Sequence, residues 1–234
     1  MTTDHTDDAA PNGPAGGTAA TAGEPMAAEE RSASRPAFRE AGPEPGFVET
    51  LLADIEWSGG PVDVADDHDP EGWRSKRLEP KRLLTCLTHL GFYSTVLYRV
   101  SRWCSRRGLT AVAAPIQMVN HSLTGAEISH RAEIGPGLRI CHPSGVFVGP
   151  HVKLGFRSTL NQGTAVSSNI DISDGTPVVG NYLYMSPGAK IMGKLTIGDR
   201  VWVGPNSVAL RDIEDDKVVL GVPGRAMPPT FRMP

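Results

Sequence analysis

The chain has 234 residues, with 26 acidic side chains and 23 Lys or Arg side chains, and its formal net charge is -3. Because acids and bases are interspersed, the sequence predicts no single-sign field that would hold a nucleic acid. It shows neither a secretory signal nor an apolar run of about 18 residues, so we expect a cytoplasmic protein that acts on small molecules and has no membrane partner.

The first 46 residues are mainly Ala, Gly, Pro, Thr and acidic residues, with almost no large apolar side chain. Burial of so little apolar surface cannot offset the entropy of ordering the chain, which predicts a disordered arm over 1–46. Residues 47–122 are interpreted as an N-terminal helical segment. It begins with a short helix over Glu49 to Ile55, followed by a polar loop through Pro70.

Apolar residues recur at helical spacing between Pro80 and Arg107, and Gly108 follows as a stop signal. This pattern predicts either one long helix or two helices broken near Gly91. A second apolar run, from Leu109 to Val119, predicts a helix that leads into Gly125. Because the run is short, packing against the next domain is favoured over membrane contact.

After Gly125 the aliphatic residues recur with a period of six, and glycine follows several of them directly. A helix needs a period of 3.6 and an isolated strand a period of two, so neither explains the pattern. The repeat runs in three registers, which are Ile128, Ile134, Ile140 and Val146; Val148, Leu154, Leu160, Val166, Ile172 and Val178; and Val179, Met185, Ile191, Ile197 and Val203.

A solenoid explains this period, because each hexapeptide supplies one strand and one corner and three hexapeptides close a triangular coil. Residues 123–234 are therefore interpreted as a mainly β domain, a left-handed parallel β-helix of hexapeptide repeats with a C-terminal tail. A sandwich of regularly spaced strands would need turn signals every 8–12 residues, which this region lacks.

The register makes His142 and Glu127 candidates for chemistry. Ile140 points inward, so His142, two positions later, is expected at a corner that faces outward. Glu127 directly precedes inward Ile128, and it lies fifteen residues before His142, close to one coil of about eighteen. A carboxylate there could orient an imidazole that acts as a general base on a hydroxyl, although an outward histidine is more often solvated surface.

Metal binding and disulfide formation are the competing uses of the histidines and cysteines. The histidine spacings of nine, twelve and nine match no ligand pattern, so no metal is predicted. The cysteines lack CxxC spacing and are odd in number, which favours reduced thiols. The residues concerned are His121, His130, His142 and His151, and Cys86, Cys104 and Cys141.

Between about Pro80 and Met227 the chain contains a set of longer motifs, namely Leu97-Tyr98-Arg99 through Arg106-Arg107-Gly108-Leu109, Leu123-Thr124-Gly125-Ala126-Glu127-Ile128, Ile134-Gly135-Pro136-Gly137-Leu138-Arg139-Ile140-Cys141-His142, Asn161-Gln162-Gly163-Thr164, Pro187-Gly188-Ala189-Lys190-Ile191-Met192-Gly193 and Gly221-Val222-Pro223-Gly224-Arg225. A single hexapeptide would carry little information, but together these motifs are specific. Over this span the chain resembles the serine O-acetyltransferases within the hexapeptide-repeat acyltransferases.

The resemblance implies an O-acyltransferase whose donor is acetyl-CoA or another acyl-CoA. It implies a homotrimer or a dimer of trimers, with active sites in grooves between neighbouring β-helices. His142 matches the family's catalytic base, and Glu127 matches the aspartate that is paired with that base. The family's cofactor-contacting positions fall on Ser168, Pro187, Gly188 and Pro205.

Two departures from the family bear on the acceptor. Cys141 occupies the position of an aspartate before the base, and Thr176 that of a second histidine in a later loop; Gln162 completes the predicted substrate-binding set. The aspartate would pair with a substrate ammonium group, and the histidine would donate to a substrate carboxylate. Because both are absent, we do not expect free serine as the acceptor but another small-molecule or carrier-bound hydroxyl, or alternatively an amine. The alternatives are a non-catalytic scaffold that binds a ligand or a partner enzyme, a zinc hydratase, and a nucleophilic Cys141.

Overall fold

A computed structural model describes residues 45–58, 80–169 and 175–229, all of which belong to one compact unit spanning 36–234. The predicted disordered arm falls outside the described residues, apart from Pro45 and Gly46. The predicted loop after Ile55 is wrong at its start, because the first helix continues to Ser58, and the remainder of that loop also lies outside.

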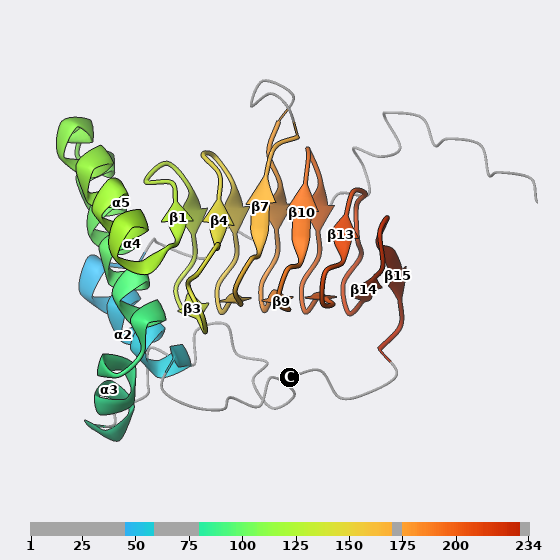
Figure 1. Cartoon of the computed structure of the whole chain (residues 1–234), viewed down its shortest axis with the longest axis horizontal. Helices are drawn as coiled ribbons and strands as arrows, with labels where there is room; N and C mark the ends of the chain where they lie inside the picture. Colours follow the sequence, from blue (N-terminus) through green and yellow to red (C-terminus); the bar gives the residue numbers. More distant parts are fainter. Residues whose placement is uncertain (1–44, 59–79, 170–174, 230–234) are drawn as a thin grey trace, which may run out of the picture. The chain divides into compact units, whose positions relative to one another are not determined.

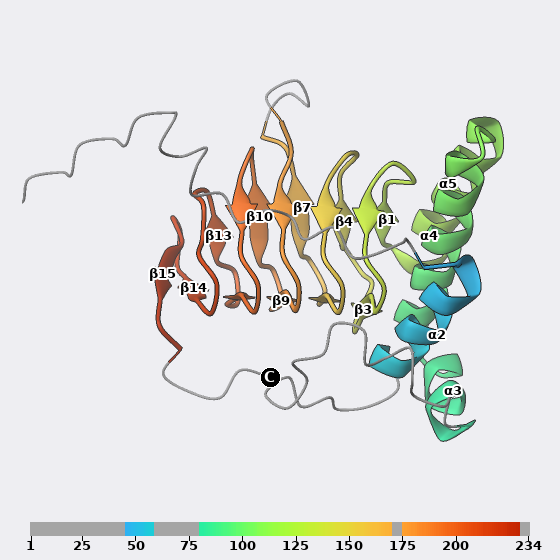
Figure 2. The same cartoon turned by 180° about the vertical axis from the view of Figure 1, so that it is seen from behind.

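In the described part of the chain four helices precede the strands, and they gather at one end of the coil stack (Figures 1 and 2). None of the helices in these described segments is long and apolar enough to cross a membrane. Their bounds are α2 Phe47–Ser58, α3 Pro80–Leu87, α4 Leu90–Arg106 and α5 Thr110–Thr124.

Of the two alternatives for residues 80–107, the structure shows two helices, because α3 ends at Leu87 and α4 begins at Leu90. A Cβ atom on Gly91 would collide with the carbonyl oxygen of Ile140, so glycine lets α4 approach the first coil closely. α5 extends beyond the predicted Val119 and ends at Gly125, whose positive φ of 75° and N–H bond to the His121 carbonyl form a left-handed cap.

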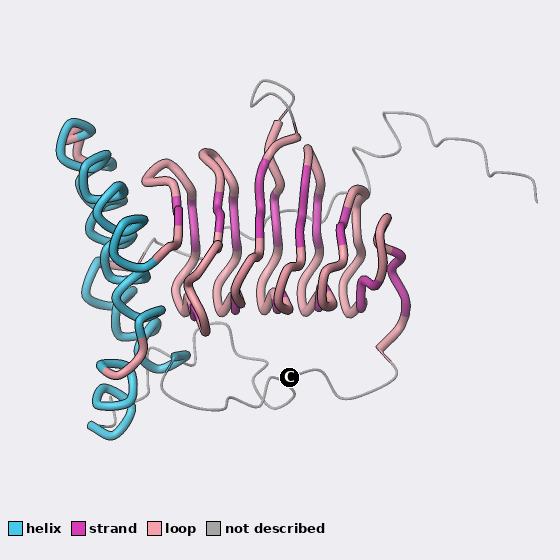
Figure 3. Tube along the Cα trace, in the orientation of Figure 1, coloured by secondary structure: helices cyan, strands magenta, loops and turns pink. Residues whose placement is uncertain are grey.

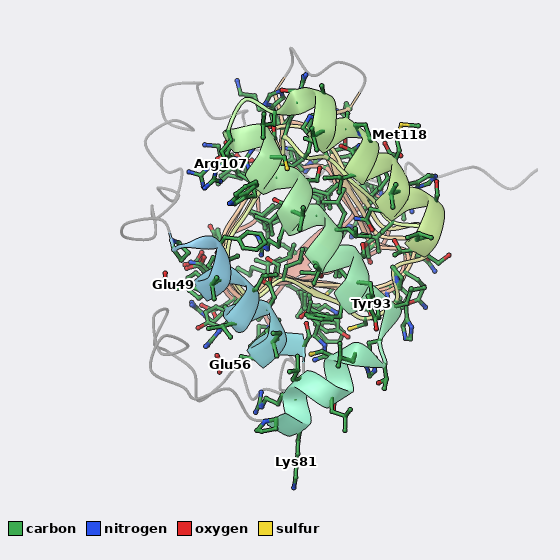
Figure 4. The ribbon with its side chains drawn as sticks, turned by 90° about the vertical axis from the view of Figure 1, so that its left-hand side faces the viewer. Glu49, Glu56, Lys81, Tyr93, Arg107 and Met118 are labelled. Carbon is green, nitrogen blue, oxygen red and sulfur yellow. The ribbon has the colours of Figure 1, made fainter. Side chains whose placement is uncertain are left out.

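The outer face of the helices is divided by polarity. Figure 4 shows Glu49, Glu56 and Arg107 on one side and Tyr93 and Met118 on the other. The side chain of Met118 is 70% exposed, and α5 contains no Asp, Glu, Lys or Arg. The helices therefore present an apolar, uncharged surface next to a charged one.

From Glu127 onward the chain winds into a left-handed parallel β-helix, as predicted, with three sheets whose strand orders are β1-β4-β7-β10-β13, β11-β8-β5-β2 and β15-β14-β12-β9-β6-β3. We call these sheets A, B and C. Figure 3 shows the strands as short segments between turns. Among the strands that the structure describes, only β15 pairs antiparallel, and it lies at the edge of sheet C. The bounds are β1 Glu127–Ile128, β2 Glu133–Ile134, β3 Arg139–Ile140, β4 Phe147–Val148, β5 Lys153–Leu154, β6 Thr159–Leu160, β7 Ala165–Ser167, β8 Val178–Val179, β9 Tyr184–Met185, β10 Lys190–Met192, β11 Thr196–Ile197, β12 Trp202–Val203, β13 Val208–Ala209, β14 Val218–Leu220 and β15 Arg225–Met227.

The aliphatic residue of each hexapeptide points into the axis of the β-helix. From Ile128 to Ala209 the inward strand residues are at most 8% exposed and form one continuous core. Burying each such side chain stabilises the fold by about 1.5–3 kcal/mol. Two register predictions are wrong: Val146 occupies a buried corner position rather than a strand, and Val178 faces outward while Val179 points inward. Ile172 lies outside the described residues.

Glycine at one corner lets successive coils stack closely. A Cβ atom on Gly135 would lie 2.8 Å from the carbonyl carbon of Gly155, and one on Gly155 would lie 2.5 Å from the carbonyl oxygen of Gly180. Gly180 meets Gly198 in the same way, at 2.8 Å. Gly135, Gly155 and Gly180 are therefore required by backbone-to-backbone contact between coils.

A buried ion pair joins the helices to the first coil. Arg99 in α4 donates to both carboxylate oxygens of Asp54 in α2, at 2.9 and 3.0 Å, and to the carbonyls of Ile134 and Gly135 at 2.6 and 2.7 Å. Asp54 accepts in turn from the backbone N–H groups of Gly137 and Leu138. Burial raises the pKa of Asp54, and the Arg99 guanidinium opposes that rise. This clamp fixes the strands of the first coil against α2 and α4.

Candidate active site

His142 lies on a corner that is longer than its counterparts. The connection from sheet C to sheet A takes six positions from Leu160 to Val166, but eight from Ile140 to Val148. The two extra residues are His142 and Pro143. Pro143 is buried and its carbonyl accepts from the Val146 N–H at 3.0 Å, whereas His142 is exposed. The corner therefore turns tightly behind His142 and presents the imidazole to solvent.

Glu127 lies on the rung next to this corner. Strands β1 and β4 pair in parallel, and Glu127 is directly opposite Phe147 in their register. Both residues are the outward members of their strands. Phe147 is the first residue of β4, and His142 lies five residues before it, on the corner that leads into β4. Glu127 is exposed, and no hydrogen bond or ion pair joins it to His142 within the part of the chain that the structure describes. Glu127 therefore lies on the outward face of sheet A, and His142 lies on the corner that leads into the adjacent strand of that sheet.

Cys141 lies between strand β3 and His142, the candidate base. It is half-buried, and burial raises the pKa of its thiol, while Arg139 acts in the opposite direction. The thiol therefore stays protonated at neutral pH, and the thiolate needed for nucleophilic attack is scarce. This argues for Cys141 as a small uncharged wall of the site rather than as an acyl carrier.

A second irregularity follows β7. Sheet A connects to sheet B over six positions from Val148 to Leu154, but over thirteen from Val166 to Val179. Ser168, 8% exposed, begins this connection, and Thr176 lies near its end. The Thr176 hydroxyl donates to the carbonyl of His151 at 2.8 Å, so its proton is already engaged in fixing the loop to the preceding coil.

The remaining predicted binding residues form a ridge on the corner between sheets C and A. The Gly188 N–H donates to the Gln162 carbonyl at 2.9 Å, and the Asn206 N–H donates to the Pro187 carbonyl at 3.0 Å, so these turns stack coil upon coil. Pro205 directly precedes Asn206. His142 belongs to the same ridge. Ser168 and Thr176 lie instead beyond the opposite ends of the sheet A strands, so the structure gathers the predicted site residues into two separate groups.

The histidines do not gather around a common point. Within residues 45–58, 80–169 and 175–229 no three His, Cys, Asp or Glu side chains converge as metal ligands would. His130 is buried and binds the Gln117 side-chain oxygen through Nδ1 at 2.8 Å, and burial lowers its pKa. It is therefore a neutral core residue.

Sequence reasoning passed over Phe147. It has the same phase as Glu127, because each directly precedes an inward aliphatic residue, so counting from Val148 would have placed it on the same face. The Asp54 and Arg99 clamp was also missed. No spacing rule links two residues 45 positions apart, and only the packing of α2 on α4 reveals the pair.

Comparisons with known proteins add to this picture. No family model matches the chain. It is 32% identical over 142 residues to a serine acetyltransferase of Synechococcus elongatus, covering 60% of this chain and 58% of the relative. It is 30% identical over 167 residues to the Bacillus pumilus enzyme of the same name, covering 71% of this chain and 74% of the relative. The crystal structure of serine acetyltransferase from Brucella abortus has the same fold, with a TM-score of 0.66, 22% identity, and coverage of 80% of this chain and 71% of that one.

Proposed function

Because the chain belongs to the serine acetyltransferase family, we propose that it transfers an acetyl group from acetyl-CoA to a hydroxyl of a small molecule. The observation that carries this proposal is the exposed His142 on the lengthened corner, one rung away from Glu127. A purely structural coil has no need of a two-residue insertion that presents an imidazole to solvent. A non-catalytic scaffold is not favoured, because the relatives are named as enzymes.

In the proposed reaction His142 takes the proton of the acceptor hydroxyl as its oxygen attacks the thioester carbonyl carbon. A new C–O bond forms, the C–S bond breaks, and the protonated imidazole returns the proton to the leaving sulfur. The products are an acetyl ester and free CoA thiol. Glu127 stabilises the imidazolium that forms in between and holds the ring in one orientation.

We infer that the acceptor is not free serine. A zwitterionic amino acid needs an anion for its ammonium group and a donor for its carboxylate. Next to His142 stands the uncharged thiol of Cys141, and the Thr176 hydroxyl already donates to the His151 carbonyl. A hydroxyl compound lacking one or both charges, either free or attached to a carrier, fits these residues better.

We further propose that the active site is completed between subunits of a homotrimer. In one chain the ridge of His142, Gln162 and Pro187 and the loop of Ser168 and Thr176 lie beyond opposite ends of the sheet A strands. A neighbouring copy would bring its loop to this ridge and leave a groove for the cofactor arm along Pro187, Gly188 and Pro205. The exposed apolar side of α4 and α5 is suited to a further contact between two trimers.

The test is release of CoA thiol by wild type, His142→Ala and Glu127→Gln with acetyl-CoA and a panel of hydroxyl and amine acceptors. We expect His142→Ala to lower kcat by about 10²-fold or more, and Glu127→Gln to lower it in the same direction. His121→Ala is the matched control, since His121 is an exposed histidine in α5. Acetyl-CoA binding and thermal stability should be unchanged in all variants. Full activity of His142→Ala would refute the assignment of the base.

A further inference from the structure

We propose that Phe147 is a specificity-determining residue, which selects an acceptor alcohol with an apolar body. The inference rests on the proposed function, because it names the substrate class of the same site. It is carried by the strand register, the residues on either side of Phe147 and the chemistry of the corner before it.

The register places Phe147 beside Glu127 with little freedom. The two residues are directly opposite in the β1 and β4 pair. Phe147 donates its N–H to the Thr164 carbonyl at 2.8 Å, and Glu127 donates to the Val146 carbonyl at 2.8 Å. A slip by one residue would turn Val148, which is fully buried, out of the core. The phenyl ring must therefore project from the face that carries Glu127.

The rungs beyond Phe147 leave room next to the ring. The outward row of sheet A continues from Phe147 to Ala165 in β7 and then to Lys190 in β10. Ala165 is small, so the position next to Phe147 in this outward row, on the side away from Glu127, carries only a methyl group. Phe147 is half-buried, and the part of the chain described by the structure gives it no aromatic partner. An acceptor can thus lay an apolar surface on the ring, above Ala165.

The charges around the corner favour the same acceptor. Cys141, directly before His142, and Phe147, five residues after it, are both uncharged. Lys190 lies two rungs from Phe147, and its Nζ donates to the Gly188 carbonyl at 3.0 Å. Glu127 is assigned to the imidazolium in the proposed mechanism. Arg139 places a cation beside the Cys141 thiol. With Glu127 assigned to the imidazolium, none of these residues offers a carboxylate to an ammonium group, whereas the Phe147 ring offers apolar contact.

The experiment compares kcat/KM for 2-phenylethanol, ethanol and serine with acetyl-CoA as donor. The ratio of the values for 2-phenylethanol and ethanol isolates the contribution of an apolar body. We expect wild type to prefer 2-phenylethanol to both ethanol and serine. In Phe147→Ser this ratio should fall by about 10-fold or more. In Phe147→Leu, which keeps an apolar side chain, the ratio should stay close to the wild-type value. Tyr184→Ser, which removes an outward aromatic on sheet C, should leave the ratio unchanged.

Three results would overturn the inference while the proposed function stands. They are a wild-type preference for serine, an equal loss in Phe147→Ser for all acceptors, and altered assembly of Phe147→Ser in sedimentation, which would make Phe147 a subunit contact. If wild type transfers acetyl to no hydroxyl compound at all, the proposed function itself fails, and the inference fails with it.

Discussion

The corner after β3 and the corner after β6 join the same two sheets, yet only the first departs from the six-residue repeat. The corner after β6 runs from Leu160 to Val166 and serves to stack coils. The corner after β3 has two additional residues, and one of them is His142. The comparison teaches that the repeat supplies the core, whereas an interruption of the repeat exposes His142, the base of the proposed function.

Changes in the regular part should therefore affect stability, and changes at the interrupted corner should affect activity. The largest expected effect on stability lies at the clamp between the helices and the first coil. Arg99→Met leaves the Asp54 carboxylate fully buried without its cation. We expect this variant to lose about 3–5 kcal/mol of the free energy of unfolding, measured by urea denaturation.

Arg200→Met is the matched control for this prediction. Arg200 forms a similar pair with Asp216, at 2.6 Å between Nε and Oδ1, but this pair is partly exposed. Its loss should change the free energy of unfolding by less than about 1 kcal/mol. Equal losses in the two variants would mean that burial of the clamp does not matter.

Gly155→Ala should have a smaller effect on stability. The added methyl group would lie 2.5 Å from the carbonyl oxygen of Gly180 on the next coil, and the backbone would have to shift. We expect a loss of about 1–3 kcal/mol in the same urea titration. Gly46→Ala is the control, because the nearest atom to an added Cβ at Gly46 would be the end of the Glu49 side chain, at the ordinary contact distance of 3.9 Å. A neutral Gly155→Ala would contradict the close stacking of the coils.

The smallest expected effect is on the reactivity of Cys141 at neutral pH. Burial raises the pKa of its thiol, so the thiolate that reacts with iodoacetamide is scarce below the usual thiol pKa of about 8.5 and grows as the pH rises. Mass spectrometry should show slower alkylation at pH 7 than for a free cysteine peptide, with a rate that climbs at alkaline pH. If Cys141 were alkylated faster than the cysteine peptide at pH 7, its thiolate would be abundant and Cys141 could act as a nucleophile.

The sequence was sufficient for the fold because a period of six is incompatible with other regular structures. The helical spacing between Pro80 and Arg107 left one helix or two open, and the structure shows that the break comes before Leu90. The register of Val178 could not be predicted, because the thirteen positions from Val166 to Val179 are not a multiple of six. Counting in sixes from Val166 therefore reaches Val178 and not the inward residue Val179. The clamp of Asp54 and Arg99 depends on contacts between distant segments, so no local pattern announces it.

For the candidate site, the outward phase of Glu127 and His142 could be read from their distances to inward Ile128 and Ile140. What the sequence could not supply was the hydrogen bond from the Thr176 hydroxyl to the His151 carbonyl. Such a hydrogen bond joins residues on different coils. It depends on the exact path of the loop after β7, which no repeat dictates.

The most direct test of the central claim is to delete His142 and Pro143 together. The deletion turns the eight positions from Ile140 to Val148 into six, the spacing found between Leu160 and Val166. We predict a variant that folds with wild-type thermal stability, within about 4 °C, and that releases no CoA thiol in the presence of an acceptor. A variant that unfolds, or one that retains transfer activity, would contradict the separation of fold and chemistry between the regular and the interrupted corners.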